Sequence, residues 1–122
     1  MNSSVTFREI RDGASNTVIF GEKTNPRNSR DLGWMSGTAA TLRHTGVPIN
    51  KGWDVASYFS PAAPVQTEPP TATATGGFSS QHAGGALFLL ADGSARFVSE
   101  RIDQKVYSYI GNREDLELLE GF

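Results

Sequence analysis

Two residues of types that often act in catalysis and metal binding stand in one glycine-rich stretch, HAGGALFLLADGSARFVSE (residues 82–100). His82 is one of only two histidines in the chain, and Asp92 follows ten positions later. Imidazole and carboxylate groups serve as general bases and metal ligands, so this pair is a candidate half of an active site. The alternative is structural, because Asp92-Gly93 between two apolar runs is also a strong turn signal. The separation of the two side chains decides between these interpretations.

The Asp92-Gly93 dipeptide predicts a hairpin closed by a two-residue type I′ turn, in which both central residues have positive φ. In that register Phe88 faces Phe97 across the hairpin, and both surfaces of the ribbon are largely apolar. We therefore expect the first strand of the hairpin to be central in its sheet and covered on both faces.

The same hairpin predicts that His82 and Asp92 do not meet. A strand rises about 3.3 Å per residue, so the two side chains are expected to lie more than about 20 Å apart. Groups that share a metal or a proton must come within a few Å of each other. We expect His82 to lie instead beside residues 100–103, where Glu100 or Asp103 orients its ring. Catalysis or metal binding by His82 is the alternative to this structural role.

Other elements follow from periodicity and turn signals. Residues 17–22 (TVIFGE) are rich in β-branched and aromatic types and predict a strand. Residues 102–111 have helical spacing in Ile102, Val106, Tyr109 and Ile110, with Asp103 as N-cap and Gly111 as the stop. Weaker patterns predict a helix at 4–11 capped by Ser3 or Ser4, extended segments at 34–35 and 42–50, and a final strand at 116–122. The expected fold is α+β, with an antiparallel sheet, a few short helices and long loops.

Composition limits the classes of function. The 122 residues suffice for one domain, and residues 60–77 are rich in proline, threonine and alanine, which predicts an exposed loop. A net charge of −2 without a block of like charges disfavours a nucleic-acid binder and a polybasic membrane anchor. The absence of cysteine excludes disulfides and thiolate metal sites. No apolar run reaches the roughly 18 residues of a membrane span, so we expect a soluble chain.

Three blocks resemble a large, prepilin-associated family of uncharacterised proteins that is abundant in planctomycete-type bacteria. The block FSSQHAGGALFLLADGSARFVSE resembles the H-x(9)-D-G signature of that family, with His82 and Asp92-Gly93 at the signature positions. The block IRDGASNTVIFGE (residues 10–22) resembles its D-G-x-S-N-T element, and VPIN (residues 47–50) is a weaker match. The blocks stand in the order of the family and span most of the chain.

The sequence departs from the family at Ala83 and Leu87, where proline and asparagine are common, and it shows no prepilin-type cleavage site or long apolar helix. We expect either that such a helix lies upstream in a longer gene product or that this copy is detached from the filament assembly. The resemblance implies a pilin-like or pseudopilin-like globular head outside the cytoplasmic membrane, which contacts other envelope or pseudopilus proteins and is not an enzyme. It carries no catalytic residues. The matching positions are expected to define the fold: Asp12, Gly13, Ser15, Asn16, Glu22, His82, Gly84, Gly85, Asp92 and Gly93.

The leading hypothesis is therefore a non-enzymatic head with no cofactor, acting through protein–protein or surface contacts. Trp34 and Trp53 are candidates for a contact patch, with burial in the core as the alternative. A second hypothesis is a calcium-stabilised module, because oxygen ligands stand near turns without the spacing of an EF-hand; they are Asp12, Asn16, Glu22 and Asp31. The weakest hypothesis is a hydrolase using His44 or His82, since no hydrolase motif is present.

Overall fold

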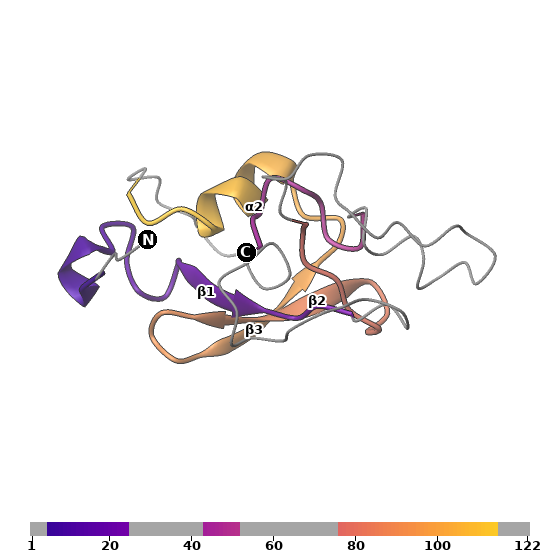
Figure 1. Ribbon diagram of the computed structural model, residues 1–122, viewed down its shortest axis with the longest axis horizontal. Coiled ribbons are helices and arrows are strands. Elements are labelled where there is room, and N and C mark those ends of the chain that lie inside the picture. Colours follow the sequence, from indigo (N-terminus) through magenta and orange to yellow (C-terminus); the bar gives the residue numbers. More distant parts are fainter. Residues whose placement is uncertain (1–4, 25–42, 52–75, 115–122) are drawn as a thin grey trace.

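The computed structural model describes residues 5–24, 43–51 and 76–114, and its sheet has three antiparallel strands in the order β1-β2-β3 (Figure 1). The elements in chain order are η1 (Phe7–Glu9), β1 (Val18–Gly21), β2 (Gly85–Leu90), β3 (Ala95–Ser99) and α2 (Gln104–Ile110). The predicted α+β class is confirmed. The predictions for Asp31, Trp34, Trp53, residues 34–35 and residues 116–122 lie outside the described residues. So do residues 60–75 of the predicted loop, whereas Gly76 and Gly77 at its end are buried.

The hairpin turn between β2 and β3 differs from the predicted type I′ turn. The Gly93 N–H donates to the Leu90 carbonyl at 3.0 Å, and the Leu90 N–H donates to the Ser94 carbonyl at 2.8 Å. Gly93 has φ +84°, whereas Asp92 does not have positive φ. This pattern is a three-residue loop in which Gly93 forms a G1 bulge. The Asp92 carboxylate accepts the Ser94 N–H at 2.8 Å, and this bond supports the loop without requiring positive φ at Asp92.

The longer loop shifts the register of β3 by one residue from the prediction. Leu87 pairs with Phe97, and Ala86 pairs with Val98. A shift of one residue turns each side chain to the other face of the sheet, so Phe97 leaves the face of Phe88. Phe97 is 51% exposed and Leu87 is 39% exposed. The prediction that β2 is central is confirmed, whereas the prediction that it is covered on both faces is wrong.

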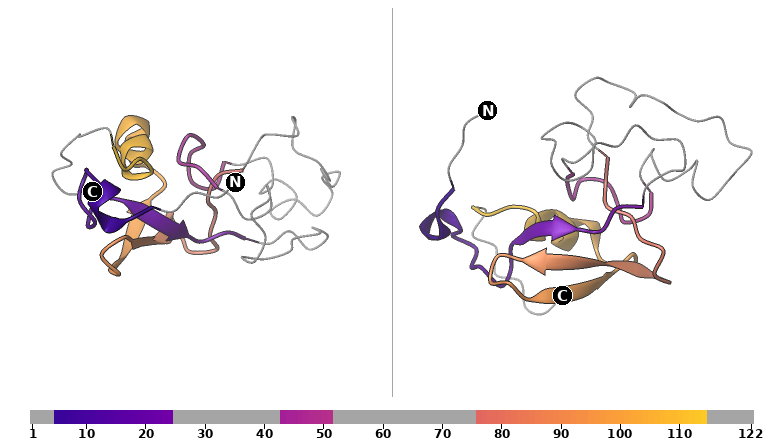
Figure 2. Two further views of the ribbon diagram at one scale, coloured as in Figure 1. Left: turned by 60° about the vertical axis from the view of Figure 1, so that its left-hand side comes forward. Right: turned by 60° about the horizontal axis from the view of Figure 1, so that its bottom comes forward.

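The core lies between α2 and the inner face of the sheet, which carries Ala86, Phe88 and Val98 (Figures 1 and 2). Asp103 caps α2 by accepting the N–H groups of Lys105 and Val106, as predicted. The helix buries Tyr107 and Ile110, so the buried stripe includes Tyr107, which the predicted stripe omitted. The rings of Phe78 and Tyr107 both lie edge-on to Phe88, with centroids 4.9 Å and 6.0 Å from its own.

The N-terminal helix is shorter than predicted and begins at Phe7. Its cap is Thr6, whose N–H and hydroxyl donate to the Glu9 carboxylate at 2.6 Å and 2.9 Å. Phe7 is 77% exposed and η1 buries none of its residues, so burial of an apolar face does not stabilise a longer helix here. The strand predicted at 17–22 is confirmed as β1. The described part of the segment predicted as extended, residues 43–50, consists mainly of turns, and Ile49 anchors it in the core.

Candidate functional site

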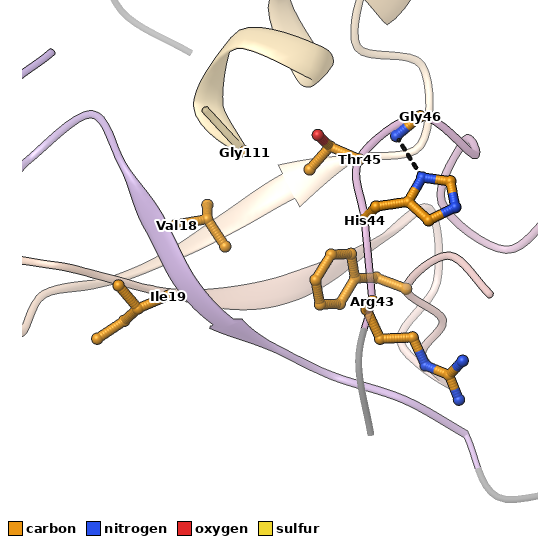
Figure 3. Close-up of a pocket in the computed structure, with 8 residues that line it drawn as sticks. Val18, Ile19, Arg43, His44, Thr45, Gly46 and Gly111 are labelled. Carbon is orange, nitrogen blue, oxygen red and sulfur yellow. Dashed lines mark hydrogen bonds between the residues drawn. The ribbon is translucent and has the colours of Figure 1, made fainter. Parts of the chain in front are cut away.

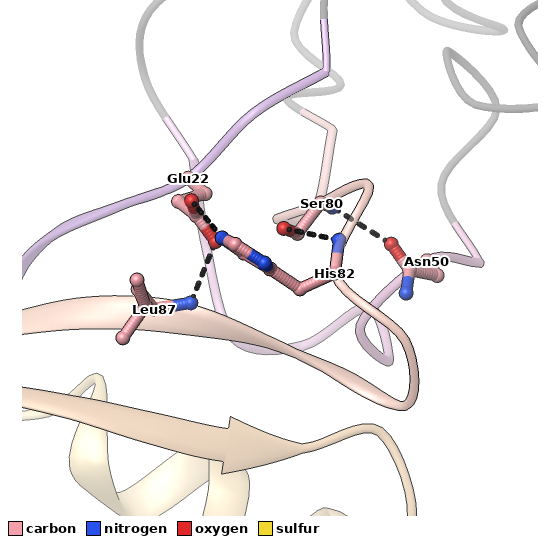
Figure 4. A network of polar contacts seen from close by, with 5 residues as sticks. All are labelled: Glu22, Asn50, Ser80, His82 and Leu87. Carbon is pink, nitrogen blue, oxygen red and sulfur yellow. Dashed lines mark hydrogen bonds and ion pairs between the residues drawn. The ribbon is translucent and has the colours of Figure 1, made fainter.

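His82 and Glu22 meet just before β2 begins, where Glu22 directly follows β1 (Figure 4). The Nε2 atom of His82 lies 3.3 Å from Oε1 of Glu22. The two side chains are 56% and 34% exposed, so water screens much of their attraction. The pair is held by different elements, since Glu22 extends from the β1 end and His82 lies in the loop that enters β2.

The other carboxylate oxygen of Glu22 binds the backbone of β2. Oε2 accepts the Leu87 N–H at 2.7 Å, and the Glu22 N–H donates to the Leu87 carbonyl at 3.1 Å. Burial raises the pKa of Glu22, and the hydrogen bonds from the Leu87 amide, Ser80 and His82 together outweigh that effect. The pKa of this carboxyl therefore lies below its usual value, and the group is ionised at neutral pH.

Polar contacts extend from this pair to residues 43–51 (Figure 4). The His82 N–H donates to the Ser80 hydroxyl at 3.1 Å, and the Ser80 N–H donates to Oδ1 of Asn50 at 2.9 Å. Asn50 has φ +62° and donates from Nδ2 to Glu100 at 3.1 Å. The VPIN match thus ends in Asn50, which has a left-handed backbone conformation. Its side chain binds the loop before β2 through Ser80 and the turn after β3 through Glu100. Asn50 and Ser80 lie in blocks that resemble the family, but the sequence predicted no role for either residue.

The prediction that Glu100 or Asp103 orients His82 is wrong. Asp103 caps α2, and Glu100 binds Asn50, whereas Glu22 takes the imidazole. The reason is long-range pairing, because β1 runs beside β2 and brings Glu22 to this end of the sheet. His82 precedes β2 and Asp92 follows it, so the two motif residues stand at opposite ends of one strand, as predicted.

Gly84 and Gly85 lie between His82 and the sheet. Gly84 has φ +82°, which bends the chain into β2. Gly85 is buried, and a Cβ atom there would collide with the Val98 carbonyl oxygen and the Phe97 ring. The second glycine is therefore required for the close approach of β2 and β3.

The remaining motif residues gather at the opposite end of the sheet. The Asn16 side chain donates to the Asp12 carbonyl at 3.1 Å, and the Asp92 N–H donates to the Ala14 carbonyl at 3.0 Å. Gly13 has φ +89° and Ser15 is exposed within the same turn. The turn that carries Asp12, Gly13 and Asn16 therefore packs against the hairpin loop.

Three of the four residues suggested for calcium binding are described, and they are divided between the two ends of β1. Asp12 and Asn16 precede the strand, whereas Glu22 follows it. No three acidic or histidine side chains come together within the described ranges, and Asp31 lies outside them. Calcium binding therefore stays a prediction, and the three described residues do not come together in one site.

A pocket of about 190 Å³ lies beside the other histidine (Figure 3). Val18, Ile19 and Phe78 form its apolar wall, and His44 stands at its polar side. Nδ1 of His44 accepts the Gly46 N–H at 3.1 Å. Because Nδ1 accepts this bond, the proton of the neutral ring lies on Nε2, and the local turn orients the ring.

The outer face of the sheet, opposite α2, is an apolar surface that sequence reasoning placed incorrectly. Its side chains come from all three strands: Phe20, Leu87, Leu89, Ala95, Phe97 and Ser99. Phe20 is 63% exposed, more than either Leu87 or Phe97. None of these six positions is charged. The signal that identifies this face is the three-residue hairpin loop, because the loop length sets which side chains share a face.

Neither the comparison with curated proteins nor the comparison with solved structures found a match. A family model described as "Protein of unknown function (DUF1559)" matches residues 1–105. That span includes all three blocks that resemble the family, the whole sheet and the start of α2. The chain therefore belongs to the DUF1559 family of proteins of unknown function.

Proposed function

We propose that this chain is the globular head of a pseudopilin-like cell-envelope protein, which acts outside the cytoplasmic membrane through contacts with other proteins and not by catalysis. The observation that carries the proposal is the outer face of the sheet. Phe20, Leu87 and Phe97 remain exposed there, without a charged residue among the six outer-face positions. Contiguous exposed apolar side chains on a small domain commonly mark an interaction surface.

The polar site supports a structural role for the motif residues. The His82 ring and the Ser80 hydroxyl both contact the Glu22 carboxylate, which also holds the Leu87 amide. A nucleophilic triad requires the imidazole to lie between the hydroxyl and the carboxylate. Here the carboxylate is the shared partner, so this network fastens the β1 end, the loop before β2 and residue 50 to one another.

The resemblance of the sequence blocks to prepilin-associated proteins supports the location and the class of partner. Within residues 5–24, 43–51 and 76–114, no helix has the length and apolar character that a membrane crossing requires. The exposed outer face of the sheet is the surface that we assign to the contacts of the proposed head.

A photo-crosslinking experiment on the full-length gene product in its own cells tests this function. A benzophenone amino acid replaces Phe20 on the outer face, and Phe7, which is 77% exposed on η1, is the matched control position. We expect a discrete adduct with an envelope protein or with a second copy of this protein from position 20, and none from position 7. Fractionation of the protein with the cytoplasm, or equal diffuse labelling from both positions, would contradict the proposal.

A further inference from the structure

β3 forms one edge of the sheet, and within the described residues no strand pairs with its outer side. The Glu100 N–H donates to the Gly84 carbonyl, and the Leu90 N–H donates to the Ser94 carbonyl. Hydrogen-bonded pairs alternate along an antiparallel ladder, so Arg96 and Val98 point their backbone groups at β2. The backbone groups of Ala95, Phe97 and Ser99 consequently point away from the sheet.

The two edges of the sheet differ in their suitability for strand pairing. The register of β1 shifts between Val18 and Phe20, and a bulge of this kind twists an edge away from an incoming strand. β3 pairs with β2 in unbroken register from Ala95 to Ser99. It has no proline, and its single charged residue is Arg96, which lies on the inner face. β3 is therefore the edge that can accept another strand.

We propose that β3 pairs antiparallel with β3 of a second copy of this chain, about a two-fold axis at Phe97. The edge is self-complementary in this register. Among the residues whose backbone groups point away from the sheet, a small residue stands on either side of Phe97. Ala95 lies opposite Ser99 of the second copy, and Phe97 lies opposite itself. A two-fold interface needs one surface that fits itself, and the order small, aromatic, small meets this requirement.

Charge and packing agree with this register. Arg96 lies opposite Val98 of the second copy, so like charges do not face each other across the seam. The two Phe97 rings meet on the outer face, and the apolar surfaces around Leu87 become continuous across both copies. The Ser99 carbonyl already accepts the Ile102 N–H at 3.1 Å, so the strongest new bonds are those of Phe97.

The interface is expected to be weak in solution. Stable complexes bury about 800 Å² per partner, whereas a five-residue edge with one aromatic side chain per copy offers less. Pairing would thus be favoured where heads are concentrated on an envelope surface. The inference rests on the proposed contact function and identifies one partner for it.

Disulfide trapping tests the pairing directly, because the natural chain has no cysteine. In a hydrogen-bonded antiparallel pair the Cα atoms lie about 5.5 Å apart, within the range that a disulfide spans. We expect Phe97→Cys to cross-link under mild oxidation at least about tenfold faster than Phe7→Cys, as pairing raises the effective thiol concentration. Equal rates from the two exposed positions would overturn the proposal.

The register is tested with two further exposed positions, Ala95 and Ser99. A mixture of Ala95→Cys and Ser99→Cys chains should give the mixed dimer at least about tenfold faster than either variant gives its own dimer. Preferential dimers of each single variant would indicate a parallel pair and overturn the two-fold register. An adduct from position 20 with another envelope protein, combined with no trapping at 97, would refute self-pairing and leave the proposed function standing. If position 20 gives no adduct and position 97 gives no trapped dimer, both the proposed function and the self-pairing are refuted.

Discussion

Glu22 and Leu87 bind each other twice, once through their backbones and once through the Glu22 carboxylate. In a regular hydrogen-bonded pair the Leu87 N–H would donate to the Glu22 carbonyl, but that carbonyl accepts the Ser79 N–H at 3.0 Å, and the Glu22 carboxylate takes its place. The last hydrogen bond between β2 and the end of β1 is therefore made by a side-chain carboxylate and not by a backbone carbonyl. Because the Leu87 amide lies in the interior of β2, the loss of this acceptor would leave a donor at the sheet without its protein partner.

Replacement of Glu22 tests this bond. Glu22→Ala should lower the free energy of unfolding by about 1–3 kcal/mol, since a hydrogen bond to a charged group is lost. Glu22→Gln keeps an oxygen that can accept the Leu87 N–H and should cost less. Urea unfolding of the two variants measures the difference, and equal losses would show that the charge, not the acceptor, stabilises this end.

His82→Ala should have a smaller effect than Glu22→Ala. His82 is more than half exposed, and exposed ion pairs contribute about 0–1 kcal/mol. A double-mutant cycle should give coupling between His82 and Glu22, and additivity within about 0.5 kcal/mol between His82 and Asp92. Measurable coupling of His82 to Asp92 would contradict their placement at opposite ends of β2.

The stability of the domain should fall as the solution is acidified below about pH 5. The pKa of Glu22 is lower in the folded chain than its usual value of 4.5, so the unfolded chain binds more protons in this window. The contribution of Glu22 is complete above pH 4.5 and is lost as the pH falls through its folded pKa. Asp92 acts in the same direction, because the Ser94 hydroxyl and amide lower its pKa. Melting temperatures from pH 3 to 7 should show a shallower acid slope for Glu22→Gln than for the natural chain.

Tyr107→Phe should leave the stability unchanged or raise it by up to about 2 kcal/mol. The Tyr107 hydroxyl is fully buried and has no hydrogen-bond partner among the described residues, and burial raises its pKa. Removal of a buried polar atom that lacks a partner relieves its desolvation penalty. Tyr109→Phe, on the half-buried side of α2, is the matched control and should be neutral. A loss above about 1 kcal/mol in Tyr107→Phe would mean that the hydroxyl has a partner, such as a buried water.

The two loop residues of the hairpin should respond differently to substitution. Gly93→Val should cost about 1–3 kcal/mol, since a β-branched residue resists positive φ. Asp92→Gly should also destabilise, because it removes both bonds to Ser94 at a position without positive φ. A type I′ turn predicts the opposite result for Asp92→Gly, so thermal melts of the two variants separate the loop types.

Local signals in the sequence were sufficient for α2, for β1 and for the hairpin of β2 and β3. The Asp103 cap and the Gly111 stop set the ends of α2, and the β-branched run after Thr17 produces β1. The hairpin itself was also predictable from Asp92-Gly93. Its loop type was not, because the dipeptide fits a two-residue and a three-residue loop equally well. That one-residue difference decides on which face Phe97 lies, and with it the location of the exposed apolar surface.

The partner of His82 required information that no local pattern contains. The sequence correctly predicted that a carboxylate would meet the ring and that Asp92 would not. The predicted hairpin register places residues 100–103 beside His82 and so selected Glu100 or Asp103, whereas Glu22 arrives through the pairing of β1 with β2. The buried position of Tyr107 was missed for a related reason, since the rotation of α2 depends on the sheet beneath it.

The order in which this fold assembles follows from the position of β1. β2, β3 and α2 are consecutive in the chain, whereas Glu22 and Leu87 are 65 residues apart. Contacts between near neighbours form before contacts that close a long loop, so we expect β1 to join last. The entropic free-energy cost of closing that loop rises by only about 0.6 kcal/mol for each doubling of the loop length. Relatives can therefore insert or lose many residues between β1 and β2 and still close the same sheet.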